Sequence, residues 1–251
     1  MNDKTISGTV EKALTLLSYL AEGGADGVTL GELAEHAALA KPTTHRLLTT
    51  LVRQAFAERV PNSRRYRIGP AITAIARRNG AADFQSQRWR ICLDKIASMT
   101  KAAALMLIRS GDEALCVEAS FGEFMVPTLT AGVGGRIPLG LGPGSLIILA
   151  SLEDTEVADI LARNAPRLLL SKTRTLDTLM ERVKRARKRG FSYDGGEVLP
   201  EVSGLAIALQ NHGVIMPMTL TLASLSSRLP PSEVDVTVEL LRGISESMLD
   251  S

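Results

Sequence analysis

The stretch Lys41-Pro42-Thr43-Thr44-His45-Arg46-Leu47-Leu48-Thr49-Thr50-Leu51 decides the fold of the first part of the chain. Pro42 suits the first turn of a helix, where its missing N–H leaves no hydrogen bond unmade. The leucines recur at helical spacing and predict a face that packs into a core. Thr43, Arg46 and Thr50 fall on the opposite face. The stretch therefore predicts a short amphipathic helix with a polar, cationic outer face.

Two further helices are expected before this one. Apolar residues recur at helical spacing from Val10 to Ala21, and Gly23 follows them. The run Thr29-Leu30-Gly31-Glu32 is a capping box, which predicts that a second helix begins here. Only Ala38-Leu39-Ala40 separates it from Pro42. Two helices joined by so short a turn, the second with an outer face of Thr and Arg, are typical of a helix-turn-helix.

A basic hairpin is expected directly after these helices. Phe56–Val60 and Arg64–Ile68 have strand character, and Pro61-Asn62-Ser63 between them is a turn sequence. Such a hairpin after a recognition helix is a wing. The first 69 residues are therefore predicted to form a winged helix-turn-helix domain.

A recognition helix presents donors and cations to the major groove, while other side chains of the domain contact phosphates. Ordinary solvated surface charge is the alternative explanation for such a face, and His45 could instead pack between the two faces. Lys41 and Arg53 are expected at phosphates, and the wing arginines at the backbone or minor groove. The candidate DNA-binding residues are Lys41, Thr43, Thr44, His45, Arg46, Thr50, Arg53, Arg64 and Arg65.

The rest of the chain is predicted to be α+β, with a mixed or antiparallel sheet. A linker helix is expected over residues 70–82, and an effector-binding and oligomerisation domain over 83–251. The expected strands are Ala103–Arg109, Ala114–Ala119, Met125–Ala131, Phe191–Tyr193, Gly204–Gln210 and Val214–Ala223, the last two joined at Asn211-His212-Gly213. The expected helices are 84–99, Ser145–Ala150 after the Gly-rich run Gly132–Gly144, Thr155–Arg163, Thr175–Arg189 and 231–248.

Composition restricts the class of protein. Hydrophobic residues make up 45% of the chain and charged residues 22%, the balance of a globular protein that needs no metal or disulfide to fold. Residues 1–80 carry eleven Lys/Arg against seven Asp/Glu, whereas the remainder is slightly acidic, which favours a nucleic-acid-binding module at the N-terminus. Neither a signal peptide nor an apolar run of bilayer length is apparent, so we expect a cytoplasmic protein without membrane contact.

The sequence resembles the isocitrate-lyase-regulator (IclR) family of bacterial transcription factors over nearly its whole length. The resemblance rests on Val10-Glu11-Lys12-Ala13-Leu14, Leu30-Gly31-Glu32-Leu33-Ala34, the stretch 41–51 and Tyr66-Arg67-Ile68-Gly69. Gly135–Leu139 and Arg187–Asp194 agree more loosely. The resemblance implies a winged helix domain, an effector-binding domain, dimers or tetramers, and repression or activation controlled by a small metabolite.

Three departures from the family pattern fall near its ligand pocket. Gly140-Leu141-Gly142-Pro143-Gly144 stands where relatives usually have a His-Ala-Thr-Ala/Ser-Gly type of run. Glu201 stands where a Gly is expected, and Gly204 where a Cys or Ser is common. These positions bear on which effector binds.

The Gly-rich run opens a helix, so its backbone N–H groups could hold an anion, such as an effector carboxylate. The glycines could equally serve a tight loop, and their GxGxG spacing is not that of a dinucleotide site. Asp194 and Glu197 could contact a polar effector or belong to a solvated loop. The candidate effector-binding residues are Gly142, Gly144, Ser145, Asp194, Glu197 and Gly204.

No nucleophile–base constellation can be assembled from His36, His45 and His212, and no metal or cofactor is expected. The leading interpretation is a regulator that binds a double-stranded DNA operator and a small organic acid or aromatic metabolite. An enzyme fused to a nucleic-acid-binding module and an architectural binder without a ligand are the alternatives. A homodimer or homotetramer is expected through Leu16, Leu20 and Ile75, because paired half-sites mirror two-fold symmetry.

Overall fold

The computed structural model describes residues 8–78, 81–124, 126–130, 132–168, 174–211 and 214–249. The chain divides into two compact units, Met1–Phe84 and Gln85–Ser251. His212 and Gly213, which were expected to form a hairpin turn, lie outside the described residues.

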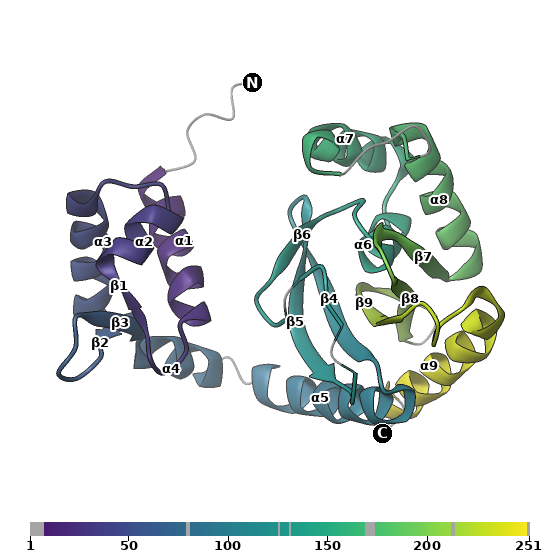
Figure 1. Ribbon diagram of the computed structural model, residues 1–251, viewed down its shortest axis with the longest axis horizontal. Coiled ribbons are helices and arrows are strands. Elements are labelled where there is room, and N and C mark those ends of the chain that lie inside the picture. Colours follow the sequence, from purple (N-terminus) through teal and green to yellow (C-terminus); the bar gives the residue numbers. More distant parts are fainter. Residues whose placement is uncertain are drawn as a thin grey trace. The chain divides into compact units, whose positions relative to one another are not determined.

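The first unit is a winged helix-turn-helix (Figure 1). Its helices are α1 (Gly8–Glu22), α2 (Leu30–His36) and α3 (Lys41–Arg53). Strands β1 (Val28–Thr29), β2 (Ala57–Arg59) and β3 (Arg65–Ile68) form an antiparallel sheet in the order β1-β3-β2, with the wing between β2 and β3. Leucines from all three helices fill the core beneath this sheet.

Local sequence signals set the ends of these helices. The Thr29 N–H donates to Glu32 Oε2 (2.6 Å), and the Glu32 N–H donates to Thr29 Oγ1 (3.3 Å), which completes the predicted capping box. The hydrogen bond from the Thr29 backbone lowers the pKa of the Glu32 carboxyl. Pro42 lies in the first turn of α3, as its missing N–H favours.

Helix α4 (Pro70–Arg78) follows the wing, and α5 (Ala81–Thr100) leads from the first unit into the second. The Gly69 N–H donates to the Phe56 carbonyl (2.9 Å), and the Ala71 N–H donates to the Ala55 carbonyl (3.0 Å). These bonds fix the start of α4 to the residues that directly follow α3.

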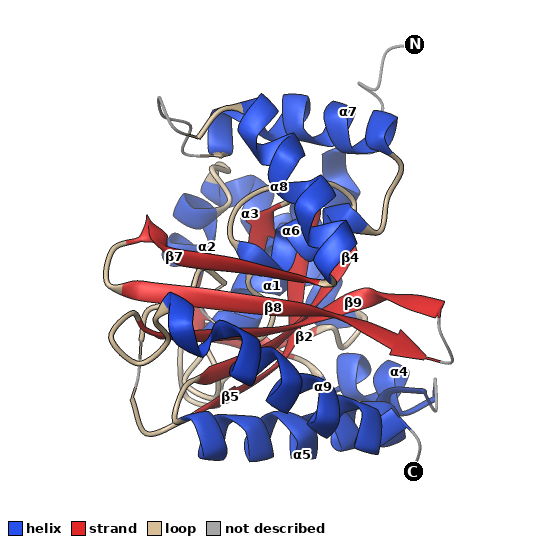
Figure 2. Ribbon diagram, turned by 90° about the vertical axis from the view of Figure 1, so that its right-hand side faces the viewer, coloured by secondary structure: helices blue, strands red, loops and turns tan. Residues whose placement is uncertain are grey.

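The second unit is built on one six-stranded sheet in which every neighbouring pair is antiparallel. This arrangement, with helices on both faces, confirms the predicted α+β class (Figure 2). In spatial order the strands are β6 (Arg136–Pro138), β5 (Glu113–Phe121), β4 (Ala103–Ser110), β9 (Val214–Leu225), β8 (Val202–Asn211) and β7 (Phe191–Leu199).

The two faces of the sheet support two separate cores. Helices α6 (Pro143–Ala150), α7 (Asp154–Asn164) and α8 (Leu176–Arg189) cover one face, and α5 and α9 (Val234–Leu249) cover the other (Figure 2). Side chains alternate along a strand. In β4, Leu105 therefore joins the first core and Met106 the second.

Two sequence-based expectations were wrong in this unit. The segment Met125–Ala131 does not form a strand over its described residues 126–130. The strand lies later instead, as β6 within the Gly-rich run, where Pro138 pairs with Glu113 of β5. Gly132 (φ 103°) and Gly134 (φ 86°) adopt positive φ and turn the chain into this pairing. Helix α6 also begins two residues before Ser145, because Pro143 takes its first turn.

Candidate DNA-binding face and effector cavity

The outer face of α3 is exposed and cationic. The side chains of Lys41, His45, Arg46, Thr50 and Arg53 are exposed, and that of Thr43 is half-buried. His45 therefore does not pack in the core. The Arg46 guanidinium makes no hydrogen bond or ion pair with any described residue, so it is available to a ligand of the helix. The Thr50 hydroxyl donates to the Arg46 carbonyl (3.2 Å) and keeps its acceptor capacity.

Thr44 does not belong to this face. Its side chain is fully buried beside Leu48 and Leu51, and its Oγ1 donates to the Ala40 carbonyl (3.2 Å). Positions 44, 48 and 51 follow helical spacing on the core side, so helix geometry removes Thr44 from DNA. We correct its assignment as a DNA-binding residue on this ground.

The two wing arginines differ in their surroundings. Arg64 is exposed next to the turn at Asn62 (φ 56°) and has no partner among the described residues. Arg65 Nη1 donates to the Gly27 carbonyl (2.8 Å) and lies 3.8 Å from Glu32 Oε2. Arg65 thus ties the wing to the turn before α2, which leaves Arg64 as the wing arginine free to contact a partner.

The second unit contains a cavity between its sheet and the first turn of α6. Its volume is small, about 60 Å³. Strand register explains which side chains meet there: Asp194, Gly204 and Ala223 pair in a row across β7, β8 and β9. One pleat away, Thr221 pairs with Leu105 of β4.

Four of the six candidate effector-binding residues line this cavity: Gly142, Gly144, Asp194 and Gly204. Each glycine is required by a close approach. A Cβ at residue 144 would lie 2.5 Å from Thr221 Oγ1, and one at 204 would lie 2.7 Å from Pro143 Cγ. Gly142 also has a φ of 78°, and its Cβ would lie 2.5 Å from Leu129 Cδ1.

Asp194 is buried, and its Oδ1 accepts hydrogen bonds from the N–H groups of Gly196 (2.9 Å) and Glu197 (2.7 Å). These bonds fix the carboxylate at the cavity wall. Glu201, which stands where the family pattern has Gly, has a φ of 64°. This left-handed conformation favours glycine and explains the pattern at this position.

The other two candidates, Ser145 and Glu197, do not line the cavity. The Ser145 side chain is fully buried, and its Oγ lies within hydrogen-bond distance of the Gly140 N–H (3.1 Å) and of the Leu141 and Gly142 carbonyls (both 2.9 Å). Glu197 is exposed and pairs with Arg182 Nη2 (2.5 Å). Ser145 therefore holds the loop before α6, and Glu197 belongs to the surface.

Two cavity residues were missed in the sequence. Thr130 and Thr221 line the cavity with buried hydroxyls; that of Thr130 interacts with the Cys116 thiol, and that of Thr221 has no hydrogen-bond partner among the described residues. Thr221 had a signal, since it interrupts the apolar residues of a strand at an inward position. Thr130 lies in a segment that we expected to be a strand, and no local pattern distinguished it.

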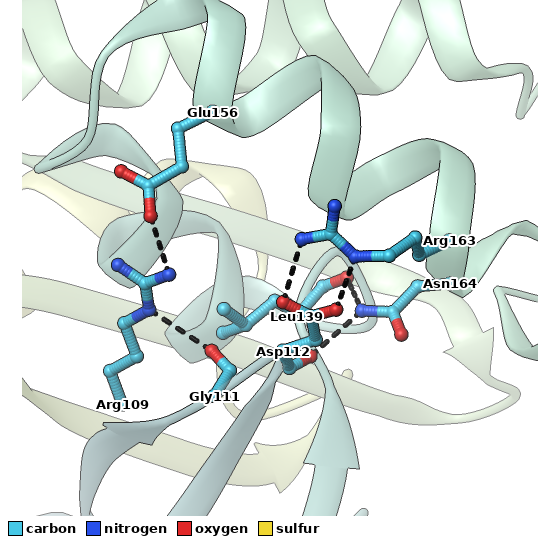
Figure 3. Close-up of polar contacts among 7 residues, drawn as sticks. All are labelled: Arg109, Gly111, Asp112, Leu139, Glu156, Arg163 and Asn164. Carbon is cyan, nitrogen blue, oxygen red and sulfur yellow. Dashed lines mark hydrogen bonds and ion pairs between the residues drawn. The ribbon is translucent and has the colours of Figure 1, made fainter. Parts of the chain in front are cut away.

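A polar network fixes the loop that leads into α6 (Figure 3). The Asp112 carbonyl accepts from the Leu139 N–H (2.9 Å) and from Asn164 Nδ2 (2.8 Å), which also donates to the Leu139 carbonyl (3.0 Å). Arg163 holds the Asp112 carboxylate through Nε (2.6 Å) and Nη2 (3.0 Å). This hydrogen-bonded ion pair lowers the pKa of Asp112. Helix α7 thereby holds the loop that forms the cavity wall.

Both cysteines are buried. Burial raises the pKa of both Cys92 and Cys116 to about 11, which keeps them as thiols at neutral pH. Within the described residues, no group of His, Cys, Asp and Glu is arranged to hold a metal ion. Over the same residues, no helix is both long and apolar enough to cross a membrane.

A winged helix-turn-helix unit followed by a unit with a buried cavity defines the class of one-chain, ligand-responsive transcription regulators. Two family models match the chain, the IclR helix-turn-helix domain over residues 9–61 and the bacterial transcriptional regulator IclR C-terminal domain over 86–248. The chain therefore belongs to the IclR family of transcriptional regulators, as its motifs predicted.

Characterised relatives agree with this assignment. The chain is 29% identical to the transcriptional repressor IclR of Escherichia coli K12 over 196 residues, which cover 75% of this chain and 69% of the relative. It is 24% identical to the regulator XynR of the same organism, with 90% and 89% coverage.

Solved structures share the fold. An IclR homologue from Microbacterium hydrocarbonoxydans, crystallised with 4-hydroxybenzoate, superposes with a TM-score of 0.77 at 19% identity, covering 97% of this chain and all of the other. A regulator from Alicyclobacillus acidocaldarius superposes with a TM-score of 0.75 at 20% identity, with 97% and 98% coverage.

Proposed function

We propose that this regulator reads its operator through the exposed face of α3 and the tip of the wing. The observation that carries the proposal is the row of exposed side chains on α3, whose opposite face is locked into the core by Leu47, Leu48 and Leu51. Thr43, Arg46 and Thr50 reach bases in this arrangement, and Lys41, His45, Arg53 and Arg64 contact phosphates. Arg65 supports the wing from within.

The cavity of the second unit is proposed to bind the effector. It combines a mostly apolar lining with a few fixed polar groups, which is the composition of small-molecule sites. The 4-hydroxybenzoate in the Microbacterium homologue supports an effector of similar, small size. Because the relatives named repressors are similar over most of the chain, we propose that the protein represses transcription and that the effector changes its affinity for DNA.

Self-association is proposed through an apolar surface of the first unit. Val10 (55% exposed) and Leu14 (58%) lie one turn apart on α1, and Ile72 (36%) and Ile75 (54%) on α4. A pair of exposed apolar side chains one turn apart on a helix is a candidate contact surface. Leu16 and Leu20, which we had expected at this contact, are fully buried in the core, so that expectation was wrong and Val10 and Leu14 replace them. A second copy of the chain is the proposed occupant, in a dimer or a tetramer.

The test is a fluorescence-anisotropy titration of the purified protein against the DNA upstream of its own gene, at two salt concentrations. Unrelated DNA of the same length is the control. We expect tighter binding to the upstream DNA, with an affinity that falls steeply as salt rises. Equal affinity for both DNAs at both salt concentrations would contradict operator recognition at this locus.

A further inference from the structure

The cavity lining has an unusual charge pattern. Among its eighteen lining residues, Asp194 is the sole ionisable side chain, and no cation is present. Asp194 Oδ1 is committed to the N–H groups of Gly196 and Glu197. Arg174 interacts electrostatically with Asp194, but it does not line the cavity and donates through Nη2 to the Gly140 carbonyl (2.7 Å). The lining residues themselves therefore carry one negative charge, and the buried Arg174 behind them offsets part of it.

The first turn of α6 compensates for this charge less than a helix start normally does. Pro143 occupies the first position and has no N–H, and Ser145 does not line the cavity. Helix N-termini attract anions through the free backbone N–H groups of the first turn. In α6, the Gly144 N–H is the one such group next to the cavity. A carboxylate bound here would thus face Asp194 at short range, and no cation among the lining residues offsets the repulsion of the two like charges.

The hydroxyls of Thr130 and Thr221 supply the complementary chemistry. Both are more than nine-tenths buried and both line the cavity, but the Thr130 hydroxyl interacts with the Cys116 thiol, whereas the Thr221 hydroxyl has no hydrogen-bond partner among the described residues. A hydroxyl both donates and accepts, so these groups suit an uncharged polar ligand. Buried polar groups normally have partners, which indicates that a ligand supplies one for Thr221.

We propose that the effector is an uncharged molecule with an apolar body and a hydroxyl or amide donor directed at Asp194, and that carboxylates are excluded. This inference rests on the proposed effector role of the cavity. It departs from the sequence-based expectation that the Gly-rich loop holds an effector carboxylate, because the structure places the Asp194 carboxylate in the same small cavity.

The test uses pairs of compounds that share a carbon skeleton and differ in one group. The pairs are propan-1-ol and propanoate, benzyl alcohol and benzoate, and 4-hydroxybenzyl alcohol and 4-hydroxybenzoate. Binding to the full-length protein is measured by calorimetry at neutral pH, with thermal unfolding as a second readout. We expect at least one alcohol to bind about tenfold or more tightly than its carboxylate partner.

Variants locate the discrimination. Asp194→Asn keeps an acceptor for the Gly196 and Glu197 N–H groups and removes the charge, so it should narrow the gap between alcohol and carboxylate to within about twofold. Glu197→Gln is the matched control, because Glu197 is a nearby carboxylate outside the cavity, and it should leave the gap unchanged. Thr221→Val, which keeps the side-chain shape, should weaken binding of the alcohol.

Several outcomes would overturn the proposal: a carboxylate that binds as tightly as its alcohol, no binding of any alcohol, or a gap that Asp194→Asn leaves intact while Thr221→Val also has no effect. Circular dichroism shows whether each variant is folded. Operator affinity is measured without ligand on the same preparations. Normal operator binding together with carboxylate preference would defeat this inference alone, whereas absent operator binding would defeat the proposed function.

Discussion

Gly204 of β8 lies against Pro143 at the start of α6, so that a Cβ at 204 would stand 2.7 Å from Pro143 Cγ and 3.1 Å from its Cδ. Both residues depart from the family pattern, which usually has Ala or Ser at position 143 and Cys or Ser at position 204. The contact explains why the two departures occur together: the ring of Pro143 fills the space that a side chain at 204 would occupy.

The first prediction concerns this pair. Gly204→Ser should destabilise the protein by about 1–3 kcal/mol, because overpacking forces α6 away from the sheet. Pro143→Ala in the same chain should recover most of the loss. Urea denaturation of both single variants and the double variant measures the coupling. Additive effects of the two substitutions would show that the contact does not limit residue 204.

The second prediction concerns base reading by α3. Arg46→Ala should cost about 1–3 kcal/mol of operator binding and leave the unfolding temperature unchanged, since the side chain has no partner among the described residues. Anisotropy titration provides the measurement. Arg90→Ala, an exposed arginine of the second unit, is the control for a general loss of positive charge. Wild-type operator affinity in the Arg46 variant would remove this residue from the interface.

The third prediction separates the two wing arginines. Arg64→Ala should weaken binding to all DNA sequences and lower the slope of log K against log salt by about 1, with stability unchanged. Arg65→Ala should lower the free energy of unfolding by about 0.5–1.5 kcal/mol, because the hydrogen bond to the Gly27 carbonyl is lost. Thermal and denaturant unfolding measure the stability of both variants. A larger loss of stability in Arg64→Ala than in Arg65→Ala would contradict this assignment.

The fourth prediction concerns pH and the Arg163–Asp112 ion pair. The folded-state pKa of Asp112 lies below its ordinary value because of Arg163. The pair therefore stabilises the fold above the unfolded-state pKa of the aspartate, and this contribution is lost as the pH falls through the folded-state pKa. Wild type should be slightly more stable than Arg163→Ala at neutral pH, and the difference should close in acid. A difference that persists under acidic conditions would contradict this role.

The fifth prediction concerns self-association. Leu14→Glu should shift the sedimentation of the protein toward a smaller species and weaken operator binding by about tenfold or more, because paired half-sites need paired winged domains. Val236→Glu, at an exposed apolar position on α9, is the control and should sediment as wild type does. Unchanged sedimentation of the Leu14 variant would place the contact between copies elsewhere.

The N-terminal unit could be predicted closely because its signals are local. The capping box at Thr29, Pro42 in the first turn of α3 and the leucine spacing each act within a few residues. The same locality explains the error at Leu16 and Leu20. Helical periodicity shows that they share an apolar face, but the other helices decide whether that face meets the core or a second copy.

The cavity was harder to predict because its residues meet through pairing of distant strands. Asp194, Gly204 and Ala223 become neighbours only through the register of β7, β8 and β9. Gly204 and Asp194 were found through motif resemblance, whereas Thr130 has no such mark. The prediction of a strand at Met125–Ala131 was wrong because β-forming residues do not specify a pairing partner. Strand β5 pairs with Arg136–Pro138 instead.

The alternation of side chains along β4 and β9 has a mechanical consequence. Leu105 and Thr221 line the cavity, while Met106 after the first and Leu220 before the second pack into the core that holds α5. Consecutive residues share one backbone, so the cavity and the surface that packs on α5 lie on opposite faces of the same two strands. A ligand in the cavity would therefore lie against the same strands that pack on α5, the helix that leads into this unit.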